Sequence, residues 1–197
     1  MNRREYIKYT TGLLGYAVSS TAVLQLMASC NNQPGLEWKP VFFSLAQASL
    51  ITEVAGTILP ETKTPGAISL DIPQLVDRLF AELLSVDDKK SFLEGMSTFE
   101  EDCIKKYGRG FQSLDKAEKE QYLIDQDKNA PKFPISMWGI NLDPHLQPST
   151  FYRRLKSMVF MGYYTSEKIS KEVLVYAPVP GDYIGCVPIG ARNSYAD

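Results

Sequence analysis

Few side chains in this sequence are of the types that carry out reactions. The 197 residues include three cysteines, Cys30, Cys103 and Cys186, and one histidine, His145. A four-cysteine iron–sulfur cluster needs more cysteines than this, and c-type haem needs a Cys-x-x-Cys-His run that does not occur. We therefore expect no metal site and no cofactor in this chain.

Candidate groups for acid–base or nucleophilic catalysis are isolated from one another. His145 lies in a proline-rich segment that should be irregular, and the sequence identifies no partner for it. The acidic pairs Asp87-Asp88 and Glu100-Glu101 lie in charged, helix-like surroundings, which are typical of a solvated face. No nucleophile elbow, dinucleotide-binding glycine motif or phosphate-binding loop occurs. We expect no catalytic residue; an enzyme built on His145 and a nearby carboxylate is the alternative.

The charge balance excludes one class of partner. Lysine and arginine number 21 and aspartate and glutamate 23, so the formal net charge is −2. Proteins that bind nucleic acids carry a clustered basic surface, which this balance does not favour. We expect no nucleic-acid partner.

The start of the chain has the pattern of an export signal. Two arginines precede an aromatic residue, an aliphatic residue and a lysine, which resembles the twin-arginine signal of a pathway that carries folded proteins. The residues are Arg3, Arg4, Tyr6, Ile7 and Lys8. An ordinary secretory signal with a chance arginine pair is the alternative.

The stretch from Thr11 to Ser29 is rich in small residues and only mildly apolar. A membrane-spanning helix needs about 20 strongly apolar residues, so we favour a removable signal over a transmembrane anchor. Met27-Ala28-Ser29-Cys30 resembles a bacterial lipobox, in which cleavage precedes an acylated cysteine. Lipid on Cys30 would hold the chain on a membrane in the periplasm; an ordinary cleavage site before a free thiol is the alternative. We expect a signal over residues 1–29, a tether over 30–43 and a helical domain over 44–197.

The periodicity of the remaining residues predicts a mainly α, single domain of about five helices with ordered loops. Each helix has a start signal and an apolar stripe, with Leu83 and Ile104 among the stripe residues. The expected helices are 45–59 after a Ser44 capping box, one from Asp71, one from Asp87 to Gly108, one from Ser113 to before Pro131, one capped by Ser149, and a short piece ending near Val173. Pro65-Gly66 predicts a type II turn between the first two helices.

An extended C-terminal arm follows from Val175 to Pro188, because its three prolines exclude a helix. An exposed apolar arm must pack on its own domain or add onto another protein, and both alternatives are open. Cys103 and Cys186 could form a disulfide outside the cytoplasm; two buried thiols and a bridge to another chain are the alternatives.

Several short motifs together resemble one family, the gluconate 2-dehydrogenase subunit 3 family, whose members are small subunits of membrane-bound flavin dehydrogenases. Each motif is weak alone, but their order and spacing span nearly the whole chain. They are the twin-arginine leader, Ile58-Leu59-Pro60-x-Thr62-x-Thr64-Pro65-Gly66-Ala67, Phe99…Tyr107-Gly108…Phe111…Leu114, Gly162-Tyr163-Tyr164-x-Ser166, and Pro180-Gly181-Asp182-Tyr183-x-Gly185.

The resemblance implies a non-catalytic chain that escorts, stabilises and tethers a large FAD-binding subunit of the glucose–methanol–choline type, which oxidises sugars or sugar acids in the periplasm. FAD would belong to that partner, and a cytochrome or quinone would accept the electrons. For the partner-binding surface we predict six residues, Tyr163, Tyr164, Tyr176, Pro180, Gly181 and Tyr183. The alternative function is a stand-alone periplasmic lipoprotein that binds a saccharide or an envelope component through Trp138 and the tyrosines.

Overall fold

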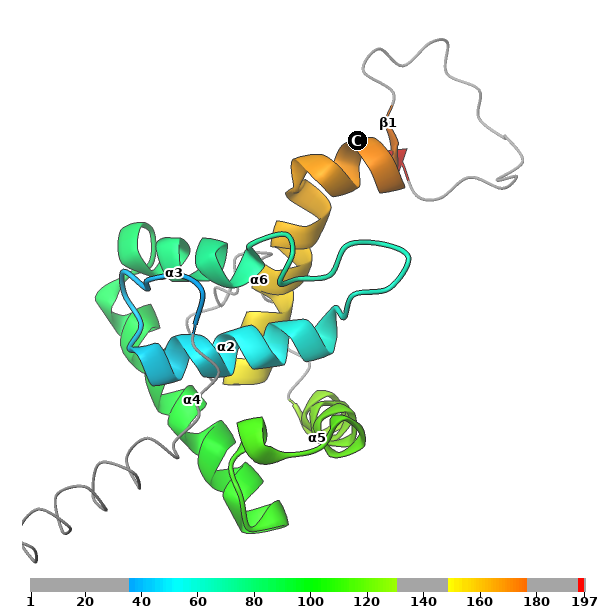
Figure 1. The fold of residues 1–197 in the computed structure, drawn as a ribbon. Helices are drawn as coiled ribbons and strands as arrows, with labels where there is room; N and C mark the ends of the chain where they lie inside the picture. Colours follow the sequence, from blue (N-terminus) through cyan, green and yellow to red (C-terminus); the bar gives the residue numbers. More distant parts are fainter. Residues whose placement is uncertain (1–35, 131–148, 177–194, 197) are drawn as a thin grey trace, which may run out of the picture. The chain divides into compact units, whose positions relative to one another are not determined.

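The structure is a computed structural model that describes residues 36–130, 149–176 and 195–196. Its α-helices are α2 (Leu45–Ile58), α3 (Ile72–Glu82), α4 (Val86–Tyr107), α5 (Lys116–Asn129) and α6 (Phe151–Thr165) (Figure 1). The shorter elements are the 3-10 turn η1 (Phe111–Ser113), the π-helical turn η2 (Ile169–Val173) and the strands β1 (Val175–Tyr176) and β2 (Tyr195–Ala196). The prediction of a mainly α, single domain is confirmed.

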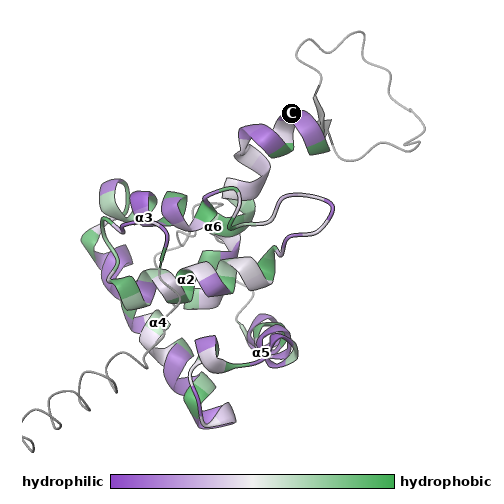
Figure 2. Ribbon diagram, in the orientation of Figure 1, coloured by the Kyte–Doolittle hydropathy of each residue, from purple (hydrophilic) through white to green (hydrophobic). Residues whose placement is uncertain are grey.

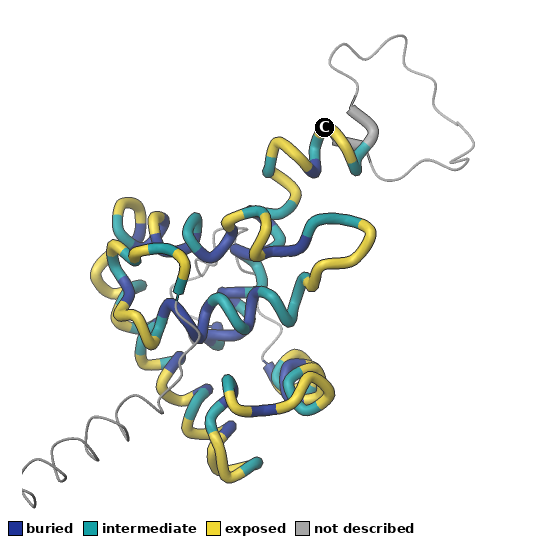
Figure 3. Tube along the Cα trace, in the orientation of Figure 1, coloured by how far each residue is buried: buried dark blue, intermediate teal, exposed yellow. Residues whose placement is uncertain are grey.

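Helix α6 is the element that the other helices share. It packs against α2, α3, α4 and α5, and its buried side carries Phe151, Leu155, Met158 and Val159. A Cβ added at Gly162 would lie 2.9 Å from Leu75 of α3, so the absence of a side chain lets the two helices approach closely. Figure 3 shows the buried stretches on the sides where the helices face one another.

A chain of aromatic rings links the helices through the core. Ring centroids lie 4.3 Å apart for Phe80 and Phe92, 4.9 Å for Phe92 and Phe151, and 5.2 Å for Phe151 and Phe99. The hydroxyl of Tyr122 donates a buried hydrogen bond of 2.7 Å to the carbonyl of Phe99. Aromatic pairs at these spacings each add about 0.5–1.5 kcal/mol beyond their buried area. The rings therefore hold α3, α4, α5 and α6 together.

One predicted helix start and one predicted helix end are confirmed, and two predicted starts are wrong. The Ser44–Gln47 capping box opens α2, and α4 ends at Gly108, whose φ of 73° lies in the left-handed region. The fourth helix, however, begins at Lys116 after an Asp115–Glu118 capping box, because Phe111 and Leu114 are buried and draw the preceding residues into a separate 3-10 turn. The start of α6 is likewise capped by Thr150, whose hydroxyl accepts from the amide of Arg153, and not by Ser149.

The N-cap of α3 also departs from the sequence expectation. Asp71 is the N-cap residue, but its backbone is left-handed with a φ of 54° and its side chain makes no capping hydrogen bond. The carboxylate accepts instead from the side-chain amide of Gln74. The predicted apolar stripes are wrong at Leu83, the C-cap residue of α3, and at Ile104, in the last turn of α4, because the fold leaves both side chains exposed.

The loop between α2 and α3 does not contain the predicted type II turn. That turn needs a positive φ at Gly66, whereas Gly108 is the one glycine with a positive φ in the part of the chain that the structure describes. A Cβ at Gly66 would lie 2.7 Å from the amide nitrogen of Glu61 and 2.8 Å from the carbonyl oxygen of Leu59. Glycine is therefore required there by a close approach of backbone, which the bond from the Ala67 amide to the Leu59 carbonyl fixes.

A buried carboxylate holds the segment that enters α2. Asp77, on α3, is 1% exposed and accepts hydrogen bonds from the backbone amides of Val41, Phe42 and Phe43 at 2.6, 3.1 and 2.9 Å. Phe42 and Phe43 then pack against Phe80. The last three residues of the predicted tether, 41–43, are thus bound to the domain, and packed structure begins before residue 44.

The chain beyond α6 passes through η2 into a short parallel pairing. Val175 pairs with Tyr195 and Tyr176 with Ala196.

Apolar and polar positions alternate around the helices, as Figure 2 shows. Within the described ranges, no helix is both long and apolar enough to cross a bilayer.

Candidate partner-docking surface

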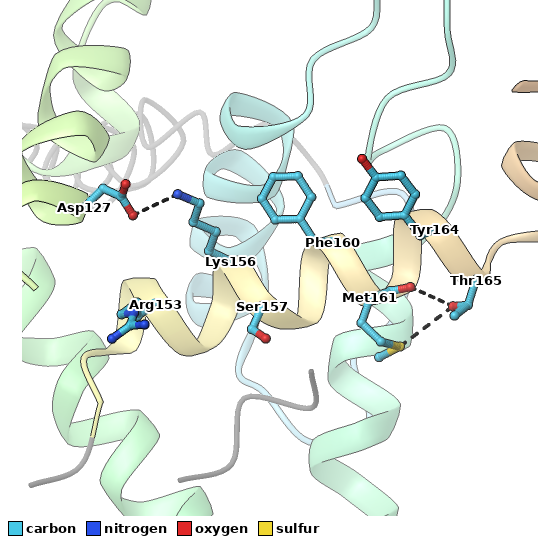
Figure 4. A pocket seen from close by; sticks show the side chains of 8 residues that line it. All are labelled: Asp127, Arg153, Lys156, Ser157, Phe160, Met161, Tyr164 and Thr165. Carbon is cyan, nitrogen blue, oxygen red and sulfur yellow. Dashed lines mark hydrogen bonds and ion pairs between the residues drawn. The ribbon is translucent and has the colours of Figure 1, made fainter. Parts of the chain in front are cut away.

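A hollow on the described surface runs along α6. It encloses about 520 Å³ and is shown in Figure 4. We call it the α6 groove, and its lining residues are Asp127, Arg153, Lys156, Ser157, Phe160, Met161, Tyr164 and Thr165. All but Asp127, which comes from α5, belong to α6.

Helical spacing explains why these side chains line up. Lys156, Phe160 and Tyr164 are four residues apart and form one row, and the residues at 153, 157, 161 and 165 form a second row beside it. The remaining positions of α6 are buried apart from Tyr163, which is half-buried. One side of the helix therefore stabilises the domain and leaves the two rows to line the groove.

The contacts within the groove order its side chains. The Lys156 ammonium lies 2.8 Å from the Asp127 carboxylate and 5.8 Å from the centre of the Tyr152 ring. The rings of Phe160 and Tyr164 stack with centroids 6.4 Å apart, and the Tyr163 ring meets Tyr164 edge-on at 5.4 Å. Tyr164 is 52% exposed although it belongs to this stack.

An ordered aromatic pair beside a lysine–aspartate pair is suited to protein recognition. Tyrosine, tryptophan and arginine carry most of the binding energy at protein interfaces, where rigid aromatic side chains fill pockets of the partner. The groove offers Phe160 and Tyr164 as apolar anchors and Arg153 and Lys156 as polar edges. Aromatic anchors bordered by charged side chains are the contents of a docking surface.

The thiol of Cys103, on α4, is held in a state that disfavours reaction as a nucleophile. Burial raises the pKa of the Cys103 thiol to about 11, and its sulfur lies 3.7 Å from the carbonyl oxygen of Arg109. At neutral pH the sulfur is a protonated thiol and a poor nucleophile. Burial also raises the pKa of Glu100, and that of Tyr152 to about 12. Among the described residues, no three acidic, cysteine or histidine side chains cluster as metal ligands would.

A second hollow, of about 330 Å³, lies where α2, α5 and the loop between α2 and α3 meet. Its charges are matched inside the chain, since Lys119 lies 2.6 Å from Glu53 and is largely buried. Ile68 and Gly56 form its apolar wall. An internal ion pair of this kind fixes α5 against α2 and leaves little charge for a ligand.

The structure places some of the predicted site residues and not others. Tyr163 is half-buried and Tyr164 is exposed, both near the end of α6. Cys103 is fully buried on α4. Tyr176 is placed by its backbone in β1. The remaining predicted residues lie outside the described residues: Arg3, Arg4, Tyr6, Ile7, Lys8, Cys30, Trp138, His145, Pro180, Gly181, Tyr183 and Cys186. The Cys103–Cys186 bridge, the export signal, lipidation and the role of the arm therefore stay predictions.

The sequence prediction missed Arg153, Lys156 and Phe160 as parts of this surface. A signal for them was present, because Phe160 does not fall on the apolar stripe that predicts the buried side of its helix. An aromatic residue off the stripe and four positions before Tyr164 marks a second, exposed apolar row.

Comparison with known proteins gives one match. The sequence model of a family described as gluconate 2-dehydrogenase subunit 3 matches residues 46–181, more than half of the chain. The matched range includes every α-helix described above apart from the first residue of α2, and it contains the α6 groove. No curated protein and no solved structure matches the chain.

Proposed function

Since the chain belongs to the gluconate 2-dehydrogenase subunit 3 family, we propose that it is the non-catalytic small subunit of a dehydrogenase and docks a large FAD-binding subunit through the α6 groove. The large subunit, of the glucose–methanol–choline type, oxidises a sugar or sugar acid in the periplasm. The family match supports the small-subunit role, and the stacked pair of half-buried Phe160 and exposed Tyr164 is the observation that supports docking on α6.

The small chain acts as an escort during export. FAD must be bound by a folded protein before it leaves the cytoplasm, and the twin-arginine pathway carries folded proteins. One leader, at Arg3 and Arg4, serves both chains if they associate first. Association also stabilises the folded partner, since a ligand that binds only the native state shifts the unfolding equilibrium toward it.

After export the small chain holds its partner at the membrane. The acyl chains on Cys30 supply the anchor, and the residues that follow Cys30 link it to the folded domain. Electrons leave the flavin of the large subunit through a cytochrome or quinone carrier. The small chain contributes position and stability and no reacting group.

The groove is tested by removing its aromatic anchors. Phe160→Ala with Tyr164→Ala should lower the amount of flavoprotein that co-purifies with the small chain by about tenfold or more, because truncating a central aromatic anchor commonly costs about 2 kcal/mol or more. Flavin absorbance of the purified complex is the measurement.

A matched control is Ile104→Ala with Ile124→Ala. It shortens one side chain on α4 and one on α5, and both are about as exposed as the Tyr164 side chain. The control should keep the flavoprotein. Equal recovery from both double variants would contradict docking on α6. Saccharide binding by the isolated chain, with no flavoprotein recovered from membranes, would favour the stand-alone lipoprotein.

A further inference from the structure

The most exposed large apolar residues of the described domain belong to three segments that meet at one end of the helices. Val86 is 80% exposed, Val41 75%, Leu83 68% and Leu45 63%, and every other large apolar side chain is less exposed among the residues that the structure describes. Figure 1 shows that the start of α2, the end of α3 and the start of α4 meet at the same end of the helical domain. We call Val41, Leu45, Leu83 and Val86 the apolar corner.

Contacts beneath the apolar corner join its three segments. Phe42 stacks on Phe80 of α3 with centroids 5.7 Å apart, and the Lys89 ammonium of α4 lies 5.5 Å from the Phe42 ring. The same ammonium donates to the carbonyl of Ala81 at 3.3 Å. The corner is therefore a fixed surface rather than three independent loop ends.

The N-terminal chain joins the domain at this corner. The three amide bonds to the Asp77 carboxylate fix residues 41–43 on the domain. Ten residues separate Val41 from Cys30. Even fully extended, a chain of that length spans no more than about 40 Å. A lipid on Cys30 would keep the corner close to the bilayer surface.

The charges around the corner are balanced. Lys39 and Lys90 are exposed there, and so are Glu82 and Asp87. A face that bound anionic headgroups by charge would carry an excess of lysine or arginine. Trp38 lies three residues before Val41, and tryptophan is enriched at the membrane–water interface. The corner thus has the composition of a surface that enters the interface through apolar contact.

We propose that the apolar corner inserts into the surface of the bilayer that holds the acyl chains of Cys30, so that the domain has a second membrane contact and one orientation on the membrane. The proposal rests on the lipidation of Cys30 in the proposed function. Acyl chains attach the chain at one point, and a single point of attachment does not set the orientation of the domain. A rigid apolar contact close to the attachment point sets that orientation.

The test places a fluorescent reporter beside the corner. The chain has two tryptophans, Trp38 and Trp138, so Trp138→Phe leaves Trp38 as the only one. The full chain, exported and processed in cells, is purified in detergent and reconstituted into vesicles of phosphatidylcholine with brominated acyl chains, which quench tryptophan at the membrane. Flotation of the vesicles measures attachment, and quenching of Trp38 measures insertion.

Leu83→Ser with Val86→Ser should leave flotation unchanged and remove most of the quenching. The matched control, Ile104→Ser with Ile124→Ser, should keep both. All four side chains are exposed, so each variant should fold, and a thermal unfolding scan checks this.

Equal quenching in the two double variants would overturn the proposal. So would loss of the co-purifying flavoprotein in Leu83→Ser with Val86→Ser while quenching persists, since the corner would then be a protein interface. A chain that fails to float overturns membrane insertion together with lipidation, whereas docking on the α6 groove is still decided by flavoprotein recovery.

Discussion

At the residue scale, the Asp77 carboxylate fixes the backbone of the segment that enters α2. It replaces water for three backbone amides at once, and it is nearly inaccessible to solvent. Hydrogen bonds to a charged acceptor are worth about 1.5–3 kcal/mol each, and leaving a buried amide unpaired costs about as much. No pattern in the sequence marks this role, because the three donors lie more than thirty residues from the acceptor.

We expect Asp77→Asn to lower the free energy of unfolding by about 1–3 kcal/mol, since the asparagine NH₂ would face the Val41 amide donor. Chemical denaturation followed by circular dichroism measures the change. The control is Asp71→Asn, at an exposed carboxylate that accepts one side-chain bond, and it should change stability by less than about 0.5 kcal/mol. Similar losses in the two variants would contradict the special role of Asp77.

At the element scale, the helices follow the sequence closely where their signals are local. Capping residues, apolar spacing and Gly108 fix the bounds of α2 and α4 within the chain itself. The start of α5 also has a local signal, the Asp115–Glu118 capping box, which the prediction from Ser113 missed. The exposure of Leu83 and Ile104 could not be predicted in this way, since it depends on which neighbouring element covers a given turn. The α6 groove could be predicted only in part. Helical spacing aligns its two rows of side chains, but only the packing of the other helices against α6 shows which rows stay uncovered.

The loop between α2 and α3 gives a prediction at this scale. Gly66→Ala should lower the free energy of unfolding by about 1–3 kcal/mol, because its Cβ would overlap the backbone of residues 59–61. Gly110→Ala is the control, since the nearest atom to its Cβ is 3.8 Å away and its φ is −69°. Thermal unfolding of both variants is the measurement, and a Gly66→Ala domain as stable as the control would refute the close approach.

At the scale of the whole molecule, the proposed escort role makes the leader act on two chains. Arg3→Lys with Arg4→Lys should leave both the small chain and the flavoprotein in the cytoplasm, because the partner would have no signal of its own. Cell fractionation with dehydrogenase activity in each fraction measures this. Lys8→Arg, which keeps the charge and the arginine pair, should export both. Normal export of the flavoprotein in the arginine variant would rule out escort.

The bond set at Asp77 also determines how the domain meets mechanical load. A tensile force along the N-terminal chain arrives at residues 41–43, where three hydrogen bonds to one carboxylate share it in parallel. Parallel loading means that the bonds must rupture together, unlike a strand that peels away one bond at a time. The force then passes into α3 and the packed rings of Phe42, Phe43 and Phe80, so that the core resists a pull on the N-terminal chain.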